Sequence, residues 1–476
     1  MNIMTDIEER LAGYVAEISS DDIPPEIADS AVMRLGDTVV CMVAGLRSAE
    51  CAALAEALRR RGGKEESTAI GVDRLLPAGS AALLNGALAH WCEWDDLHDG
   101  AIIHASAVIW PVLLAVAEAE GLDGRDGFDE VLAGAVAAYD VAGRIGEVLT
   151  PLSPNGWYST SVACAAGAAA GAARLSGLKT EGILSAMGLA ATACALLRQP
   201  ILDRASGKNA LCAQTASAIM TALDLAKAGI SGARTFLVGD YGLSLMLTGQ
   251  RAPFDAAVED LGRRFSVAEI SVKPYPCCRA THPSVDLALA LREQADASTI
   301  DRIEISVCEP MFEVVGRPFE PGDNPRMAAL FSIPYTVASA LIHGRVDLDT
   351  FDPACIEADH AARDLAGRIH VSARPIPPGT TMYQVPVALS ATMKNGKEWS
   401  LSTTDVLGSP AKPLTTEAMS RKMASCAKGA LSQDEAGELE KWALSVRQAG
   451  LAPVMSLVRG ARYWRPDESR RLTAAE

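Results

Sequence analysis

The chain has 476 residues, of which 49% are hydrophobic but only 5% are aromatic. This length exceeds one ordinary hydrophobic core and predicts two domains. The formal net charge of -16 argues against a nucleic-acid partner, because phosphate backbones need clustered Lys and Arg. A small anionic substrate is still compatible with this charge, since a local basic pocket can lie inside an acidic protein.

The chain shows no sign of secretion or of a membrane span. Its first 18 residues are acidic and amphipathic, without the basic and apolar regions of a signal peptide. No uninterrupted apolar run approaches the roughly 20 residues of a membrane helix. The 11 cysteines lack metal-type spacing and are interpreted as free thiols in a reducing compartment. We therefore expect a cytoplasmic protein without membrane contact.

From the start to about residue 265 the hydrophobic pattern is helical. Small residues recur at three- and four-residue spacing, which predicts helices that cross closely in a core. Most segments end in a Gly-bearing turn or a polar break. The expected helices cover residues 28–46, 80–94, 104–121, 129–149, 161–178, 180–197 and 212–229.

The pattern changes near residue 266 and changes back near residue 408. Alternating, β-branched segments predict strands, and the last contains an Asn395-Gly396 hairpin turn. Two helices separate them, and further helices follow to the end of the chain. The fold class is therefore mainly α: a large all-helical domain, residues 1–265 and 408–476, interrupted by a smaller α+β lid with an antiparallel sheet, residues 266–407. The chain therefore crosses between the two domains twice, which favours a site between them. The expected strands cover residues 266–276, 299–310, 366–375 and 386–405.

One segment, HWCEWDDLHDGAIIHAS, carries the most titratable groups. His90, Asp95 and His98 cannot share one face of a single helix, so we expect a helix end followed by a loop. Asp95, Asp96 and His98 would line this loop, and His104 would begin the next helix. A solvated acidic loop would explain the acids alone, but explains the two later histidines less well. His90 is placed one helical turn outside the loop, where replacement by Asn should be nearly silent.

Other candidate residues lie at element boundaries. Tyr158 precedes a Ser/Thr-capped helix of small residues, although an ordinary capped helix with a surface aromatic explains it equally well. Lys208 opens a helix, where a cation is electrostatically misplaced unless it meets an anion; chance is the alternative. Lys273, Arg279 and His282 gather three cationic or titratable groups within ten residues. Tyr335, at another helix start, is by itself more typical of a core.

Together these segments resemble the MmgE/PrpD family, which includes 2-methylcitrate dehydratase, cis-aconitate decarboxylase and iminodisuccinate epimerase. The likeness extends over nearly the whole chain. It implies an all-helical domain interrupted by an α+β lid, usually as a homodimer, without a metal or organic cofactor. The segments that carry it are AVMRLGDTVVCMVAGL, NGALAHWCEWDDLH, HASAVIWPVLLAVAEAEG, GAVAAYDVAGRIG, AAGAAAGAARLSGL, VKPYPCCRATH and GSPAKPLT.

The match is incomplete in the loop that the family reads as D-x-D-D-T and H-P-S. Glu93 replaces an Asp, Leu97 a Thr and Ala105 a Pro, and Tyr158 stands where the family commonly has a His. Lys208, Lys273 and Tyr335 match the family's two Lys positions and its Tyr. These departures count against decarboxylation of cis-aconitate and against strict 2-methylcitrate dehydration.

The resemblance implies a cofactor-independent lyase of the dehydratase type, which moves a proton at a carbon beside a carboxylate of a small di- or tricarboxylate. Such a carbon acid needs a positioned base and a counter-charge for the developing anion. The alternatives are an epimerase of an imino- or amino-dicarboxylate and a catalytically silent relative that binds a small acid. Lys273 is expected to be the essential cation. The expected catalytic residues are His104, Tyr158, Lys208 and Lys273, and the expected substrate-binding residues are Glu93, Asp95, Asp96, His98, Arg279, His282 and Tyr335.

Overall fold

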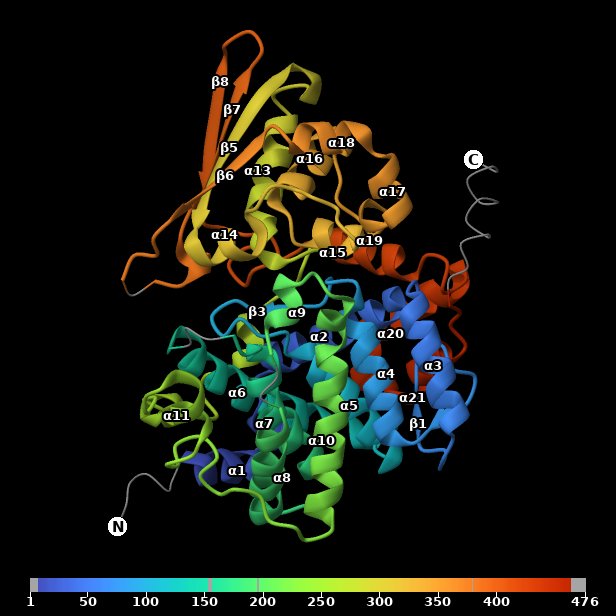
Figure 1. The fold of residues 1–476 in the computed structure, drawn as a ribbon. Helices are drawn as coiled ribbons and strands as arrows, with labels where there is room; N and C mark the ends of the chain where they lie inside the picture. Colours follow the sequence, from blue (N-terminus) through green and yellow to red (C-terminus); the bar gives the residue numbers. More distant parts are fainter. Residues whose placement is uncertain (1–6, 153–155, 195–196, 379, 464–476) are drawn as a thin grey trace.

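The computed structural model describes residues 7–152, 156–194, 197–378 and 380–463, which fold into a helical domain and a smaller lid above it (Figure 1). The mainly helical fold with a smaller α+β part confirms the fold class that the sequence predicts. The helical domain contains α1 (Ile7–Glu17), α2 (Pro25–Gly45), α3 (Ala49–Arg61), α4 (Ala78–Trp91), α5 (Ser106–Ala119), α6 (Phe128–Leu149), α7 (Ser159–Leu175), α8 (Thr180–Ala193), α9 (Gln199–Leu202), α10 (Leu211–Lys227), α11 (Leu243–Thr248), α12 (Asp255–Glu259), α19 (Thr416–Ala427), α20 (Gln433–Ala449) and α21 (Ala452–Arg459), with the short strands β1 (Ser67–Thr68), β2 (Leu75–Leu76), β3 (Leu97–His98) and β4 (Ile270–Ser271).

Close helix crossings hold the helical core together, as the spacing of small residues predicts. A Cβ on Gly167 of α7 would lie 2.4 Å from the Ala138 carbonyl oxygen of α6. A Cβ on Gly45 of α2 would lie 2.4 Å from the Leu88 carbonyl oxygen of α4. Any side chain at these positions would push the helix axes apart. The glycines therefore set the distance between helices that carry the site.

The lid is built on a four-stranded sheet in the order β6-β5-β7-β8. β5 pairs antiparallel with β7, and β7 with β8, but β5 and β6 are parallel. The sheet is thus mixed, because the helices between β5 and β6 return the chain to the same end of the sheet. The lid contains α13 (His282–Arg292), β5 (Ile300–Cys308), α14 (Glu309–Val315), α15 (Pro325–Leu330), α16 (Ile333–His343), α17 (Pro353–Ala358), α18 (His360–Ala366), β6 (Ile369–Arg374), β7 (Val387–Met393) and β8 (Glu398–Thr403).

The junction between the domains differs from the expected strand over residues 266–276. Only β4 is extended there, and it pairs with β3 rather than with the lid sheet. Pro274 and Pro276 follow at once and lack the N–H that a longer ladder requires. Ile270 belongs to the helical core, whereas Tyr275 is the first residue of the lid core. The pairing of β3 with β4 places Lys273 beside the loop after α4.

The last helices return to the helical domain (Figure 1). Leu439, Trp442 and Val446 of α20 are buried in the helical core. Lys422 of α19 forms a buried ion pair with Asp37 of α2 at 2.6 Å and donates to the Trp94 carbonyl at 2.9 Å. The C-terminal segment therefore helps to fix the loop that follows α4.

Among the described residues, no single helix has both the length and the apolar character of a membrane span. The pair α2 and α3 reaches that threshold only when the two helices are counted together, and they are bent by 94°. Most of α2 is buried inside the protein.

Candidate active site

A cavity of about 470 Å³ opens between the helical domain and the lid. The helical domain contributes Glu93, His104, Tyr158 and Lys208 to its lining. The lid contributes, among others, Cys278, Arg279 and Tyr383. Basic and hydroxyl groups from both domains, together with the Glu93 carboxylate, thus converge on one cavity, which is the arrangement expected of a ligand site.

The loop after α4 has an unusual backbone. Glu93 and Ile102 have φ values of 53° and 54°, in the left-handed region that residues other than glycine seldom adopt. Both residues line the cavity. The start of α7 holds the far end of the loop: Ser159 donates to the Ile102 carbonyl at 2.6 Å, and Thr160 accepts from the His104 backbone N–H at 3.0 Å. Strained residues fixed by such contacts are typical of functional sites.

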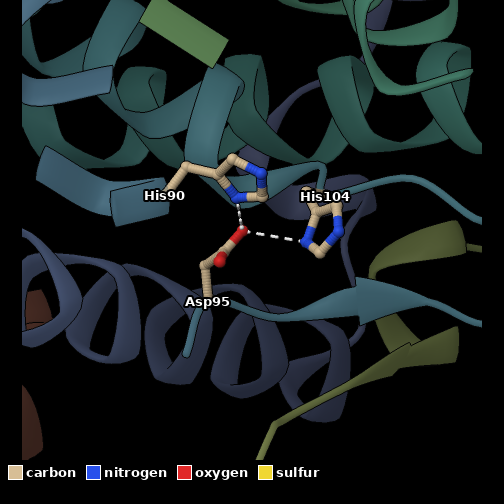
Figure 2. Close-up of side chains that lie close together, drawn as sticks. All are labelled: His90, Asp95 and His104. Atoms are coloured by element: carbon tan, nitrogen blue, oxygen red, sulfur yellow. Dashed lines mark hydrogen bonds and ion pairs between the residues drawn. The ribbon is translucent and has the colours of Figure 1, made fainter. Parts of the chain in front are cut away.

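His90, Asp95 and His104, here called the relay cluster, form the centre of the site (Figure 2). One oxygen of Asp95 accepts from His90 Nδ1 at 2.8 Å and from His104 Nδ1 at 2.9 Å. His104 Nδ1 also lies 3.0 Å from the Asp96 carbonyl, a second acceptor. Because both neighbours only accept, His104 Nδ1 carries the proton, and Nε2 is the basic atom of the neutral ring.

The other nitrogen of His90 meets two donors. Tyr158 donates its hydroxyl to His90 Nε2 at 3.2 Å, and Lys208 Nζ lies 2.8 Å from the same atom. Burial lowers the pKa of His90 well below its ordinary value, although Asp95 opposes this. The ring is therefore neutral and can accept at Nε2 while it donates at Nδ1. A continuous row of hydrogen bonds runs from Tyr158 through His90 and Asp95 to His104.

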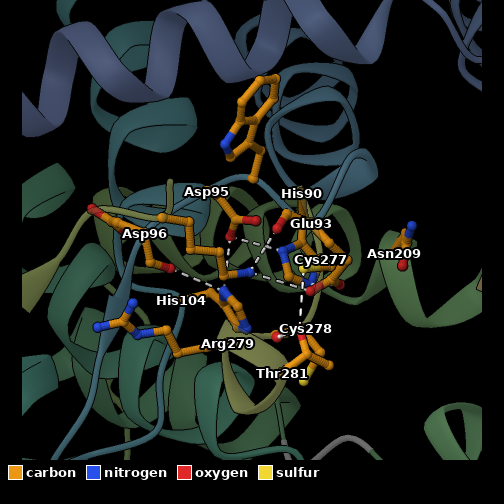
Figure 3. A network of polar contacts seen from close by, with 12 residues as sticks. His90, Glu93, Asp95, Asp96, His104, Asn209, Cys277, Cys278, Arg279 and Thr281 are labelled. Carbon is orange, nitrogen blue, oxygen red and sulfur yellow. Dashed lines mark hydrogen bonds and ion pairs between the residues drawn. The ribbon is translucent and has the colours of Figure 1, made fainter. Parts of the chain in front are cut away.

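Glu93 lies between two lysines (Figure 3 shows Glu93 beside His90). Its carboxylate forms an ion pair with Lys208, and Lys273 donates to its backbone carbonyl at 2.8 Å and lies 3.4 Å from its second carboxylate oxygen. Burial lowers the pKa of Lys208, and the charge of Lys273 lowers it further; contact with the Glu93 carboxylate acts in the opposite direction. Lys208 lines the cavity, whereas Lys273 lies behind Glu93.

The two aspartates of the loop have opposite electrostatic environments. Burial alone would raise the pKa of Asp95, but His90, His104 and Lys273 outweigh it and hold that pKa well below its ordinary value. Burial raises the pKa of Asp96 to about 6, although the hydrogen bond that Asp96 accepts from the Ser106 hydroxyl lowers this pKa in part. Asp95 is therefore an anion near neutral pH, and Asp96 supports the start of α5 away from the cavity.

Comparison with known proteins divides the chain near the junction between the helical domain and the lid, although the C-terminal match also includes α19 and most of α20. Residues 9–254 match the MmgE/PrpD N-terminal domain, and residues 275–448 match the MmgE/PrpD C-terminal domain. The chain belongs to the MmgE/PrpD family.

Relatives within this family are similar over about three quarters of their length. The chain is 27% identical to the cis-aconitate decarboxylase-like protein oryM of Aspergillus oryzae, over 74% of this chain and 77% of that protein. It is 24% identical to the cis-aconitate decarboxylase of Aspergillus terreus, over 74% of each chain. It is 25% identical to the human cis-aconitate decarboxylase, over 78% of this chain and 76% of that protein.

The structure brings together most, but not all, of the residues singled out in the sequence. Glu93, His104, Tyr158, Lys208 and Arg279 line the cavity. Asp95 and Lys273 lie directly behind this lining and contact it.

The remaining candidates lie elsewhere. Tyr335 is buried in the lid core and donates to the Thr350 carbonyl at 3.1 Å. His282 is buried behind Arg279, and burial with the neighbouring positive charge of Arg279 lowers its pKa. His98 points away, toward Glu147 and Glu269, at 3.6 Å and 3.5 Å. These three residues, His98, Glu147 and Glu269, are called the surface cluster below.

The main residue that sequence reasoning misplaced is His90. It was expected outside the site because helical spacing separates it from the loop. However, α4 ends one residue later, and the loop turns back so that Asp95 and Glu93 both reach the His90 ring. Its position three residues before Glu93, at the end of an apolar helix, was the available signal. Tyr383 and Cys278 were also missed, since no spacing relates them to the loop.

The relay cluster also has the ligand types of a metal site. One nitrogen from each histidine and one Asp95 oxygen lie within 4.8 Å of one another. Both Nδ1 atoms, however, point at the same oxygen at hydrogen-bond distance, and a metal would need them without their protons. The geometry fits a shared carboxylate between two imidazoles better than a cation.

Proposed function

We propose that the chain is a lyase of the dehydratase type that removes a proton from the carbon beside a carboxylate of a small di- or tricarboxylate. The observation that carries the proposal is the row Tyr158–His90–Asp95–His104, whose two ends line the cavity beside Lys208. Membership of the family, and relatives named as cis-aconitate decarboxylases, support a lyase acting on a polycarboxylate.

Each group has a role that follows from its surroundings. Lys208 and Arg279 bind the substrate carboxylates. His104 Nε2 takes the proton from the carbon, and the Asp95 carboxylate stabilises the imidazolium that forms. Lys208 stabilises the negative charge that develops on the substrate. Burial raises the pKa of Tyr158, so its hydroxyl is protonated and can donate to the departing hydroxide, which leaves as water.

A second candidate is an epimerase of an imino- or amino-dicarboxylate. It is favoured by the fact that two proton carriers share Asp95, His104 directly and Tyr158 through His90. One could take a proton from one side of a carbon while the other returns one to the opposite side. The third possibility, a silent relative, predicts binding of a small acid without proton exchange.

The test is incubation of the protein in deuterated water with a panel of hydroxy-, imino- and unsaturated polycarboxylates, followed by NMR. A lyase produces loss of water or carbon dioxide, and an epimerase produces deuterated epimers without loss. The control is His104→Gln, which should abolish exchange while the protein stays folded by circular dichroism. Binding of these acids with no exchange under any condition would refute both enzymatic proposals.

We also propose that the chain forms a homodimer, because its small and aliphatic residues exceed what one cleft needs. Sedimentation at micromolar concentration is the measurement. A particle of the monomer mass of 49.9 kDa would contradict the proposal.

A further inference from the structure

The cavity has two chemically different walls. Of the groups assigned to the chemistry, Glu93, His104, Tyr158 and Lys208 belong to the helical domain, and Arg279 belongs to the lid. Apart from Arg279, the lid lining has no charged side chain among the described residues, and its apolar side chains are Ala280, Pro310, Val314, Phe331, Ile376 and Met382. A substrate made only of carboxylates would pair with the charged groups and leave the apolar side chains of the lid in contact with water.

These lid side chains are not sealed into the lid core. Val314, Ile376 and Met382 are half-buried and pack with one side on the lid core, while they also line the cavity. Core residues of the same domain, such as Val307, are 0% exposed. Apolar surface that faces a cavity rather than the core gains free energy when a ligand covers it.

The helical domain extends the apolar wall toward the catalytic groups. Leu97, which is 2% exposed, and Trp157 line the cavity. Ile201 lines it too and packs against the lid core. The Phe331 ring centroid lies 5.2 Å from Lys208 Nζ. Apolar contact is therefore available directly beside the cation that would hold a carboxylate.

The size of the cavity agrees with a substrate larger than a compact acid. Its volume of about 470 Å³ falls within the roughly 300–1,000 Å³ of pockets that enclose drug-sized ligands. Most of the lining that the charged groups leave over is apolar, and such pockets owe much of their affinity to covered apolar surface.

We propose that the substrate carries an apolar substituent of several carbons in addition to its carboxylates, and that the lid wall formed by Val314, Ile376 and Met382 binds this substituent. The inference rests on the proposed function, since it assumes that the carboxylates lie at Lys208 and Arg279. It narrows the substrate class to alkyl-substituted polycarboxylates.

Calorimetric binding of 2-alkylsuccinates, from succinate itself to 2-hexylsuccinate, tests the inference directly. We expect the dissociation constant to fall roughly threefold with each methylene until the wall is covered. The isosteric double variant Val314→Thr/Met382→Gln should lower the preference for 2-butylsuccinate over succinate by about tenfold. The matched control is Val371→Thr, a half-buried lid valine that does not line the cavity, and it should leave the preference unchanged.

The two proposals fail in different ways. If the polycarboxylate panel exchanges deuterium but chain length does not change the dissociation constant, the alkyl inference is wrong and the proposed function stands. An equal loss of preference in Val371→Thr would also overturn the inference, because the effect would then be general to the lid. If no acid of the panel exchanges and no succinate binds, the proposed function is wrong and the inference with it.

Discussion

The relay cluster and the surface cluster each combine histidine with carboxylates, and each includes a residue of the loop after α4. They differ in what accompanies their carboxylates. In the relay cluster the Asp95 oxygen has two imidazoles as its partners and is buried. In the surface cluster Arg264 binds both Glu147, at 2.9 Å, and Glu269, at 3.0 Å. His98 Nε2 has no hydrogen-bond partner among the described residues.

This difference shows which carboxylate is free to polarise an imidazole. A carboxylate whose charge is already balanced by a guanidinium has little left to polarise an imidazole. A buried carboxylate shared by two imidazole rings instead orients both and stabilises whichever one takes a proton. The identity of the counter-charge, more than the presence of His and Asp, separates the two clusters.

The largest effect is expected for Asp95→Asn. The amide can donate to His104 Nδ1 and thereby favour the wrong tautomer, so kcat should fall by roughly 10³- to 10⁴-fold, as for other catalytic histidines that lose an orienting carboxylate. The matched change in the surface cluster, Glu147→Gln, should alter kcat by less than about threefold, because it touches no group of the proposed chemistry. Steady-state kinetics on the acid found by deuterium exchange measures both. Equal losses would remove the distinction between the clusters.

Lys273→Met should lower turnover by at least about a hundredfold, since it leaves Glu93 with one cation fewer in a buried site. Arg264→Met breaks the ion pairs with Glu147, Glu269 and Asp260, in which the arginine side chain is 33% exposed. These groups lie outside the proposed chemistry, so turnover should change little. Urea denaturation accompanies the kinetics, because an unpaired Glu93 can also destabilise the fold. The double variant Lys273→Met/Glu93→Gln should recover stability but not activity. Near-normal turnover in the single variant would refute this role for Lys273.

His90→Asn should lower kcat by roughly a hundredfold, within the range for loss of an acid–base contact. This replaces the expectation from sequence that the change is nearly silent. The matched variant, His98→Asn, should stay within about threefold of the wild-type protein. Because His90 acts through Tyr158 and Asp95, its loss should also shift the pH profile of kcat, which a purely structural role would not do. An unshifted profile with normal kcat would restore the earlier expectation.

A smaller effect concerns pH and stability. The pKa of Asp96 is raised from 3.8 to about 6, so the folded state holds this proton more tightly than the unfolded chain. The resulting stability is complete below about pH 4 and is lost as the pH rises through about 6, a change of roughly 3 kcal/mol. Urea denaturation of wild type and Asp96→Asn between pH 4 and 7 should show this difference.

In the surface cluster the dependence of stability on pH has the opposite sign. Burial raises the pKa of Glu147, but Arg264 and His98 outweigh it and lower that pKa overall. The stability that Glu147 contributes is therefore present above its unfolded pKa and is lost as the pH falls. Glu147→Gln should accordingly differ from wild type mainly at acidic pH, and a parallel trend for both variants would contradict the assignment.

The smallest effect is expected on treatment with a chelator. Dialysis against EDTA should leave activity and melting temperature unchanged, because both Nδ1 atoms of the relay cluster are committed to Asp95. A loss of activity that zinc restores would instead make the relay cluster a metal site.

Much of the fold was predictable because the spacing of hydrophobic residues indicates which positions face a core. The long helices α2, α6, α7 and α10 and the strands β5, β6, β7 and β8 lie within a few residues of the expected segments. The sheet order was not predictable, since the parallel pairing of β5 with β6 depends on where five intervening helices carry the chain.

The sequence by itself determined which segments meet at the cavity: the acidic loop after residue 90, Tyr158, Lys208 and the crossover at Lys273. Only the tertiary structure decided how they divide into roles. His90 enters the site and His98 leaves it because the backbone turns at Glu93, in a left-handed conformation that no side-chain periodicity encodes. Likewise Lys273 lies behind Glu93 rather than on the cavity. A hydrophobic pattern records burial, whereas a partner's identity depends on contacts between residues far apart in the chain.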